Sequence, residues 1–306
     1  MWRIKAPALA LGIVAGLAGC DARSAPNQPA SRPVVRLSTS AESAIGFALA
    51  ALPQFSVQAV NIGDSEKRLA ALQQGTIDVA LTVADVTYLA FTGRLPHLSQ
   101  PLDKIRGIAL LSPGAVHLMI GPGIDPSRGF AGRRVVFGDP GGGNAALGER
   151  LIRSMGIPRS ETQGVFLPRG PAVKELLRGN VGAVVVTGWP PDKSVSQALT
   201  GGAHLLDVDG PTIDHLRAYY PLLRRIVIPR DTYPGQNVPL HTVGVDLLLV
   251  CRADLDANLV YELTRAYFED TPEKFRRKTD PQRAAAVVIP LHPGAARYYR
   301  EREVSR

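Results

Sequence analysis

Short apolar runs alternate with amphipathic stretches from residue 34 to the end of the chain. Continuous apolar runs bounded by polar residues predict β-strands, and apolar positions at helical spacing predict helices. The predicted strands cover residues 34–37, 55–60, 79–83, 108–111, 116–120, 135–137, 165–167, 183–186, 204–208, 225–228 and 243–250. The predicted helices include residues 64–74, 144–155, 171–178 and 255–268. This alternation predicts an α/β fold of mixed, mainly parallel sheets flanked by helices.

Two segments of the chain repeat the same pattern. Residues 72–83 and residues 176–187 each read as the end of a helix, a Leu-x-x-Gly step and a continuous apolar strand. Gly75 and Gly179 supply the left-handed residue that commonly ends a helix. Because the two units follow the same plan 104 residues apart, we predict two lobes that are built alike. The simpler interpretation is that helix–glycine–strand units recur in many α/β proteins.

Each predicted lobe has a loop that joins the carboxyl end of a strand to the amino end of a helix. Residues 38–43 follow the first strand, and residues 138–144 follow the strand at 135–137. Ligands of open α/β sheets bind in such crevices, and the free N–H groups at a helix start attract anions. Helix N-capping explains any one of the polar side chains equally well. The candidate ligand-binding residues in the two loops are Thr39, Ser40, Ser43, Gly142, Gly143 and Asn144.

The first 33 residues differ in composition from the rest. Two basic residues precede a short apolar run that ends in small residues and Cys20, which is the pattern of a secretory signal peptide. The ending resembles a bacterial lipobox, in which lipid is attached to the cysteine. Asp21 resembles the signal that keeps lipoproteins on the outer face of the inner membrane. We therefore predict a signal peptide at residues 1–19, lipidation of Cys20, a disordered tether at residues 20–33 and a periplasmic location.

Charge and residue counts narrow the function classes. The chain carries 35 basic and 27 acidic residues, a net charge of +8. The basic residues are scattered and the protein is predicted to be exported, so we expect no nucleic-acid partner. The six histidines lack metal-ligand spacing, so we predict no metal. Cys251 is the single thiol left after lipidation, and its strand-like surroundings predict a buried structural cysteine.

No arrangement of residues typical of an enzyme stands out. The sequence lacks a G-x-S-x-G nucleophile elbow and a cysteine–histidine pair in a suitable context. Residues 141–146 match the dinucleotide-binding pattern G-x-G-x-x-A, but the acidic Glu161 precedes the next predicted strand instead of ending it. We therefore predict neither an enzyme nor a cofactor.

The C-terminal third carries the most specific motifs: residues 228–236, 242–245, 250–255, 260–264 and 289–299. Together with residues 84–88, 115–117 and 138–143, they resemble the TAXI family, the solute-binding proteins of one branch of the TRAP transporters. The resemblance covers nearly all of residues 34–300. It implies a two-lobed periplasmic binding protein, type II-like, with the ligand cleft between the lobes. We expect lobe 1 to comprise residues 34–115 plus 240–306, and lobe 2 to comprise residues 116–239.

The resemblance also implies a function. TAXI proteins capture a small organic anion or amino acid, such as glutamate or a dicarboxylate, and deliver it to TRAP-type membrane permease subunits. Asp85 and Tyr88 lie in one of the matching segments and join the candidate ligand-binding residues. Thr187 and Trp189, at the carboxyl end of a predicted strand, join them as well. Packing between a helix and the sheet explains Trp189 equally well.

Both loops depart from the family pattern. The first family loop reads Thr-Gly-Ser-x-Gly-Gly and is followed by two tyrosines, whereas residues 38–46 lack those glycines and tyrosines. The second family loop has serine or threonine where this chain has Gly142 and Gly143. The departures leave a second hypothesis open: a sensor or scaffold lipoprotein with the same fold and an altered or degraded ligand pocket.

Overall fold

A ten-stranded mixed sheet runs through the described part of the chain. The computed structural model describes residues 32–38, 53–95, 98–125, 130–138, 143–157, 159–271 and 281–304, and residues 33–306 form one compact unit. The strands are β1 (Val34–Ser38), β2 (Ser56–Ala59), β3 (Val79–Val83), β4 (Ile105–Ile120), β5 (Arg134–Val136), β6 (Gln163–Val165), β7 (Ala183–Gly188), β8 (His204–Leu205), β9 (Leu223–Ile228) and β10 (Leu240–Arg252). The helices are α2 (Ser65–Gln73), α3 (Ala84–Phe91), α4 (Gly143–Ser154), the 3-10 helix η1 (Arg159–Glu161), α5 (Arg169–Leu177), α6 (Lys193–Thr200), α7 (Pro211–Tyr219), α8 (Ala257–Glu269), α9 (Pro281–Ala284) and α10 (Pro293–Val304).

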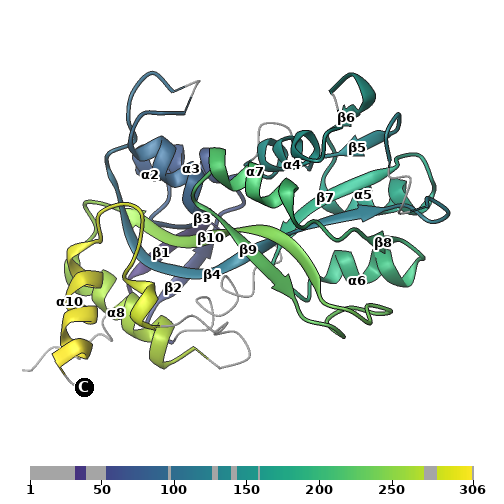
Figure 1. Cartoon of the computed structure of the whole chain (residues 1–306). Coiled ribbons are helices and arrows are strands. Elements are labelled where there is room, and N and C mark those ends of the chain that lie inside the picture. The colour runs from purple at the N-terminus through teal and green to yellow at the C-terminus, as the bar shows by residue number, and fades with distance from the viewer. Residues whose placement is uncertain are drawn as a thin grey trace, which may run out of the picture. The chain divides into compact units, whose positions relative to one another are not determined.

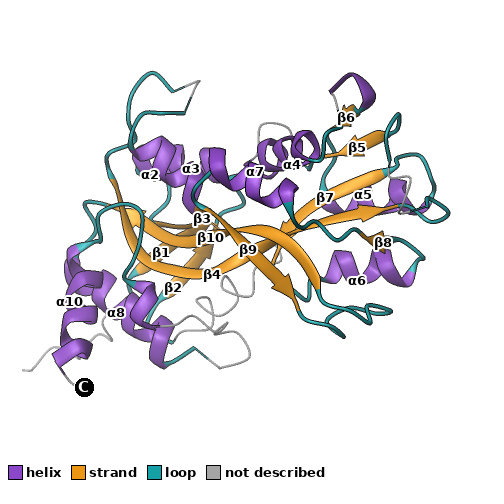
Figure 2. Ribbon diagram, in the orientation of Figure 1, coloured by secondary structure: helices purple, strands orange, loops and turns teal. Residues whose placement is uncertain are grey.

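Two groups of parallel strands lie on either side of a central pair. The strand order is β2-β1-β3-β10-β4-β7-β5-β6, with β8 beside β4 and β9 beside β10 (Figure 2). We call β1, β2 and β3 the first strand group, and β5, β6 and β7 the second strand group. Pairing is parallel inside each group. The predicted α/β fold, a mixed sheet flanked by helices, is confirmed.

The central strands β4 and β10 are long enough to pair with both groups. Residues 105–115 of β4 pair with β10, and residues 115–120 pair with β7, both antiparallel. Strand β10 likewise pairs antiparallel with β3 through residues 247–251 and with β9 through residues 240–245. The prediction of mainly parallel pairing is therefore wrong for the centre of the sheet and for β8 and β9, and holds only within the first and second strand groups. Composition alone does not reveal strand direction.

The predicted break between two strands at 108–111 and 116–120 is also wrong, because β4 continues through Ser112-Pro113-Gly114. Such a sequence is typical of a turn. Pro113 lies opposite Asp246, next to a register shift in the β10 ladder. An irregularity of this kind accommodates a residue that has no N–H to donate. Pairing with β10 therefore overrides the local turn preference.

Alternating side chains divide the core between two faces of the sheet. In β10, Leu248 and Val250 belong to one apolar cluster, and Leu249 and Cys251 belong to another. The first cluster also includes residues of α2, α3, α4 and α7, which cover what we call the upper face (Figure 1). On the opposite, lower face, α8 and α10 cover the first strand group, and α5 and α6 cover the second. Burial of Cys251 confirms the predicted structural thiol and raises its pKa.

The repeated units fold as predicted. Helix α2 leads through Gly75 into β3, and helix α5 leads through Gly179 into β7. Both glycines have positive φ, 73° and 76°, which a residue with a Cβ adopts only with strain. The carboxyl ends of β3 and β7 are thereby set on opposite sides of β4 and β10. Division of the unit into two lobes at the predicted boundaries stays a prediction.

Candidate functional site

Two buried hydroxyl groups at the carboxyl ends of strands lack a hydrogen-bond partner among the described residues. Ser38 ends β1 and is 0% exposed, and Thr187 lies one residue before the end of β7 and is 8% exposed. Among the described residues, Ser38 Oγ and Thr187 Oγ1 have no donor or acceptor within reach. An unpaired buried polar group costs about 1–3 kcal/mol, so such groups are uncommon in native proteins. Both hydroxyls are therefore candidates for a ligand contact.

Strand register places the two hydroxyls on the same face of the sheet. Ser38 lies opposite Ala80 of β3, and Thr187 lies opposite Val116 of β4. Side chains directly opposite one another across two strands share a face. Ala80 and Val116 both belong to the apolar cluster of the upper face. Ser38 and Thr187 therefore face α3, α4 and α7 from either side of the central strands.

Two charged side chains come from the helices over this face. Asp85 lies in the first turn of α3, is half-buried and accepts a hydrogen bond from the Val86 N–H at 2.8 Å. Burial raises the pKa of Asp85, against the opposing effects of that bond and of the positive Arg150. Arg150, on α4, places its guanidinium 4.3 Å from the centre of the Tyr220 ring. Neither charge forms an ion pair with a described residue, so both are available to a ligand of opposite charge.

A polar network on the lower face holds the end of β7. One Arg169 guanidinium nitrogen donates to Asp192 Oδ2 at 2.7 Å, and the other donates to the Thr187 carbonyl at 2.9 Å. Asp192 Oδ1 caps α6 by accepting from the N–H groups of Ser194 and Val195. Burial alone would raise the pKa of Asp192, but Arg169 and the capping bonds outweigh it and lower the pKa. Asp192 is therefore a carboxylate that links β7 to the starts of α5 and α6.

The network continues through a buried tyrosine and a buried histidine. The Asp192 N–H donates to the Tyr233 hydroxyl oxygen at 3.0 Å, and that hydroxyl lies 2.7 Å from His117 Nε2. His117 Nδ1 lies 3.3 Å from the Val186 carbonyl. Burial lowers the pKa of His117 to about 4, so the ring is neutral near pH 7. With Nδ1 donating to the Val186 carbonyl, Nε2 accepts from the Tyr233 hydroxyl. Every hydrogen bond in this network then has one donor and one acceptor.

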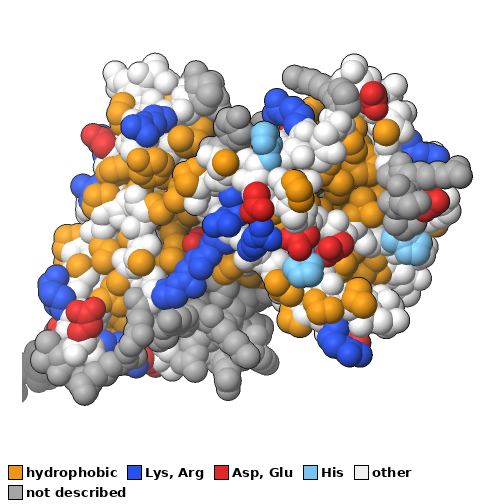
Figure 3. Space-filling model, viewed as in Figure 1, with side chains coloured by type: hydrophobic (Ala, Val, Ile, Leu, Met, Phe, Trp, Pro, Cys, Tyr) orange, Lys and Arg blue, Asp and Glu red, His pale blue; other side chains and the backbone are white. Residues whose placement is uncertain are grey.

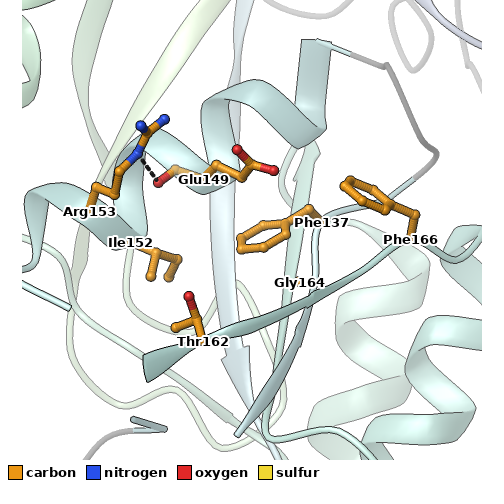
Figure 4. Close-up of a pocket in the computed structure, with 7 residues that line it drawn as sticks. All are labelled: Phe137, Glu149, Ile152, Arg153, Thr162, Gly164 and Phe166. Atoms are coloured by element: carbon orange, nitrogen blue, oxygen red, sulfur yellow. Dashed lines mark hydrogen bonds between the residues drawn. The ribbon is translucent and has the colours of Figure 1, made fainter. Parts of the chain in front are cut away.

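A separate cavity of about 120 Å³ lies between α4 and the edge strand β6. Figure 4 shows the rings of Phe137 and Phe166 side by side, with the Glu149 side chain extending toward them and Arg153 pointing away. Phe166 is 41% exposed, so the cavity is open to solvent. The residues that line it include none of the predicted ligand-binding residues.

Opposite charges pair on the exposed surface over α7 and β9. Figure 3 shows basic, acidic and histidine side chains gathered there. Arg225 forms ion pairs with Asp209 at 2.6 Å and with Asp214 at 2.5 Å. These acidic partners compensate part of the positive charge on this face.

The sequence profile of the NMT1-like family matches residues 42–302. This chain belongs to the NMT1-like family. A solved structure from Bordetella bronchiseptica RB50 is similar to this NMT1-like protein with a TM-score of 0.51 and 17% identity, over 88% of this chain and 80% of that one. PhnD1 from Prochlorococcus marinus, solved in complex with methylphosphonate, has a TM-score of 0.50 and 10% identity over 78% and 85% of the two chains. The periplasmic aliphatic sulphonate binding protein SsuA from Escherichia coli has a TM-score of 0.46 and 17% identity over 89% and 84%. The fold is that of periplasmic binding proteins.

The structure of this NMT1-like protein describes only some of the predicted site residues. Thr187 lies on the upper face near the end of β7, Asp85 lies in the first turn of α3, and Tyr88 lies one turn after Asp85; their contact with a ligand stays a prediction. Gly143 and Asn144 open α4, as the loop pattern predicts. Five further predictions lie outside the described residues: Cys20, Thr39, Ser40, Ser43 and Gly142.

Trp189 packs against the lower-face cluster beneath α8 and α10. This contact is the packing role that the sequence left open, and a ligand contact stays a prediction. Sequence reasoning missed Ser38 and Arg150. Ser38 is adjacent to the predicted loop residues, but its complete burial depends on the pairing of β1 with β3. Arg150 lies two turns into its helix, where no loop pattern marks it.

Proposed function

We propose that this NMT1-like protein is a periplasmic receptor for a small organic anion or amino acid. The observation that carries the proposal is the pair of unpaired buried hydroxyls, Ser38 and Thr187, on one face of the sheet and on either side of the central strands. In an α/β sheet, ligands bind at the carboxyl ends of strands, which is where both residues lie.

The charges on the helices over the same face suit a solute that carries an anionic group. Arg150 offers a guanidinium fork that matches a carboxylate, sulfonate or phosphonate. Asp85 offers a half-buried carboxylate that suits an ammonium group or a hydroxyl donor. Glutamate or a dicarboxylate would use Arg150, and an amino acid would use Asp85 in addition.

Delivery to the membrane completes the proposal. The resemblance to TAXI proteins supports TRAP-type permease subunits as the partner, and lipid on Cys20 would hold the receptor close to them. PhnD1, which has the same fold, was solved with a small anion, methylphosphonate. This supports an anionic solute and leaves the type of permease to the TAXI resemblance.

Thermal unfolding of residues 20–306 with Cys20→Ser, against a panel of amino acids, dicarboxylates, sulfonates and phosphonates, tests the proposal. A ligand at a hundredfold excess over its Kd stabilises the folded state by about 2.7 kcal/mol, which raises the Tm by about 4–5 °C in a chain of this size. We expect one class of solute to produce this shift. Arg150→Met should abolish it, whereas Arg153→Met, one turn further along α4 and exposed, should preserve it. No shift with any member of the panel would contradict the proposal and favour a sensor or scaffold.

A further inference from the structure

Asp192 makes more hydrogen bonds than the capping of α6 requires, and the additional ones hold the end of β7. Asp192 Oδ1 alone satisfies the capping role, since it accepts from the Ser194 and Val195 N–H groups. Its second oxygen, Oδ2, binds Arg169, and Arg169 in turn binds the Thr187 carbonyl. A Cβ on Gly188 would lie 2.6 Å from Asp192 Oδ2, so the glycine allows the carboxylate to approach the strand. These bonds fix the backbone that carries the Thr187 hydroxyl.

A distant turn supplies the hydroxyl that completes the network. Tyr233 opens the Tyr-Pro-Gly-Gln turn between β9 and β10, 41 residues from Asp192 and 116 from His117. The turn is closed by a hydrogen bond from the Asp231 N–H to the Gln236 carbonyl at 2.9 Å. The Gln236 amide donates to the carbonyls of Pro229 and Val238 at 3.0 and 2.9 Å. The turn thus has its own supports, and the buried hydroxyl of Tyr233 points outside it.

Tyr233 and Thr187 act on opposite faces of the same strand. His117 and Tyr233 lie on the lower face, where the Tyr233 ring packs with Val184 and Val186 of β7. The Thr187 side chain lies on the upper face with Val116. The hydrogen bonds on the lower face therefore set the position of the end of β7. The Thr187 hydroxyl, carried by that strand end, faces the candidate site on the upper face.

We propose that Tyr233 is a positioning residue for the ligand site. Through Asp192 and His117 it fixes residues 187–192, and thereby the Thr187 hydroxyl, so that the β9–β10 turn belongs to the binding apparatus. The link to ligand affinity rests on the proposed function, whereas the fixing of the loop does not. This division allows the two ideas to be tested separately.

The full chain contains a fluorescence reporter for the loop at residues 187–192. Its two tryptophans are Trp2, inside the predicted signal peptide, and Trp189, inside the loop. Residues 33–306 form a compact unit with its own core, so residues 20–306 with Cys20→Ser can be studied by themselves. Fluorescence of that protein therefore reports on Trp189 alone.

The experiment compares Tyr233→Phe with two controls. Tyr233→Phe keeps the ring but removes the hydroxyl that accepts a hydrogen bond from the Asp192 backbone N–H and donates one to His117 Nε2. Tyr261→Phe makes the same chemical change on α8, where the hydroxyl bonds Glu301 at 2.6 Å. Leu263→Ala, at a buried leucine of α8, controls for general loss of stability. In Tyr233→Phe alone, we expect Trp189 emission at longer wavelength, at least a doubling of the acrylamide quenching constant, and a Kd weakened about tenfold for the solute that stabilises the parent protein.

Each outcome tests either the fixing of the loop by Tyr233 or the effect of that fixing on ligand affinity. Parent-like emission and quenching in Tyr233→Phe would overturn the proposal, and so would altered fluorescence with an unchanged Kd. An equal change in Leu263→Ala would also overturn it, because general destabilisation would then explain the effect. If no solute binds the parent protein, the proposed function fails, while the fluorescence of Tyr233→Phe still decides whether Tyr233 fixes the loop.

Discussion

Thr187 is buried and its hydroxyl has no hydrogen-bond partner within the described part of the chain, which is unfavourable unless a ligand uses it. Thr187→Val keeps the shape and removes the unpaired group, so we expect the ligand-free protein to become more stable by about 1 kcal/mol. Thr242→Val is the matched control, because Thr242 Oγ1 donates to the Val116 carbonyl at 2.7 Å. That change should lower stability by about 1 kcal/mol. Urea unfolding measures both, and a loss of stability in Thr187→Val would contradict our assignment.

His117 makes stability depend on pH. Burial lowers its pKa to about 4 in the folded protein, whereas a histidine in the unfolded chain has a pKa of about 6.5. Between these values the unfolded chain binds more protons, so stability is complete above about pH 6.5 and falls by about 3 kcal/mol as the pH drops toward 4. The charged neighbours Asp192 and Arg169 act in opposite directions on this pKa.

Urea unfolding at pH 7 and pH 4.5 tests this dependence. His117→Gln removes the titrating group and should flatten the difference between the two pH values. His241→Gln, at an exposed histidine, should leave the difference unchanged. If the free energy of unfolding changed equally between the two pH values in the parent protein and in His117→Gln, other groups would cause the acid sensitivity.

At the scale of single residues, the sequence marked Thr187 and Asp85 as candidates, whose role in binding stays a prediction, and it did not mark Ser38 or Arg150. Thr187 follows a continuous apolar run, which marks a strand end. Whether a hydroxyl at such an end is buried and unpaired depends on the neighbouring strands, which the local pattern does not contain. The role of Tyr233 was hidden for the same reason: its partners, Asp192 and His117, are remote in sequence.

Among the elements, β10 packs closely against β4 and β9 where it crosses them. Gly244 has no room for a side chain, since a Cβ there would meet the Gly114 carbonyl and lie 2.7 Å from Ile226 Cγ1. Gly244→Ala should therefore destabilise the protein by about 1–3 kcal/mol. Gly170→Ala, in the first turn of α5 with open space around it, should be neutral or stabilising by up to about 1 kcal/mol. Thermal unfolding of the two variants checks this contrast, and similar Tm values would contradict it.

Local patterns predicted elements well where each residue's neighbours in sequence decide its conformation. The helix–glycine–strand units at 72–83 and 176–187 are examples, because a left-handed glycine ends each helix. Prediction failed where pairing with another strand decides the backbone conformation. The Ser-Pro-Gly segment of β4 has the composition of a turn, yet β10 holds it in the sheet.

For the whole molecule, the predicted lipid anchor governs location. None of the described helices combines the length and apolarity needed to cross a bilayer. Cys20→Ser in the full chain should move the protein from the membrane fraction to the soluble periplasmic fraction, and Cys251→Ser should leave it at the membrane. Fractionation followed by immunoblotting measures this. Membrane retention of Cys20→Ser would contradict lipid anchoring.

The overall architecture was predictable because strand–helix alternation, the repeated units and the C-terminal motifs all indicate the same fold. The solute was not predictable, because its contacts come from residues that only the folded chain brings together. Ser38 and Thr187 are 149 positions apart in the sequence, yet they share a face of the sheet.

Calorimetric titration tests the central claim, that these two hydroxyls hold one solute, most directly. The solute that most stabilises the parent protein would be titrated into that protein, into the double variant Ser38→Ala/Thr187→Val and into Thr242→Val. We expect one solute per chain, an affinity weakened at least about tenfold in the double variant, and little change in Thr242→Val. Full affinity in the double variant would contradict the claim and place the binding site elsewhere.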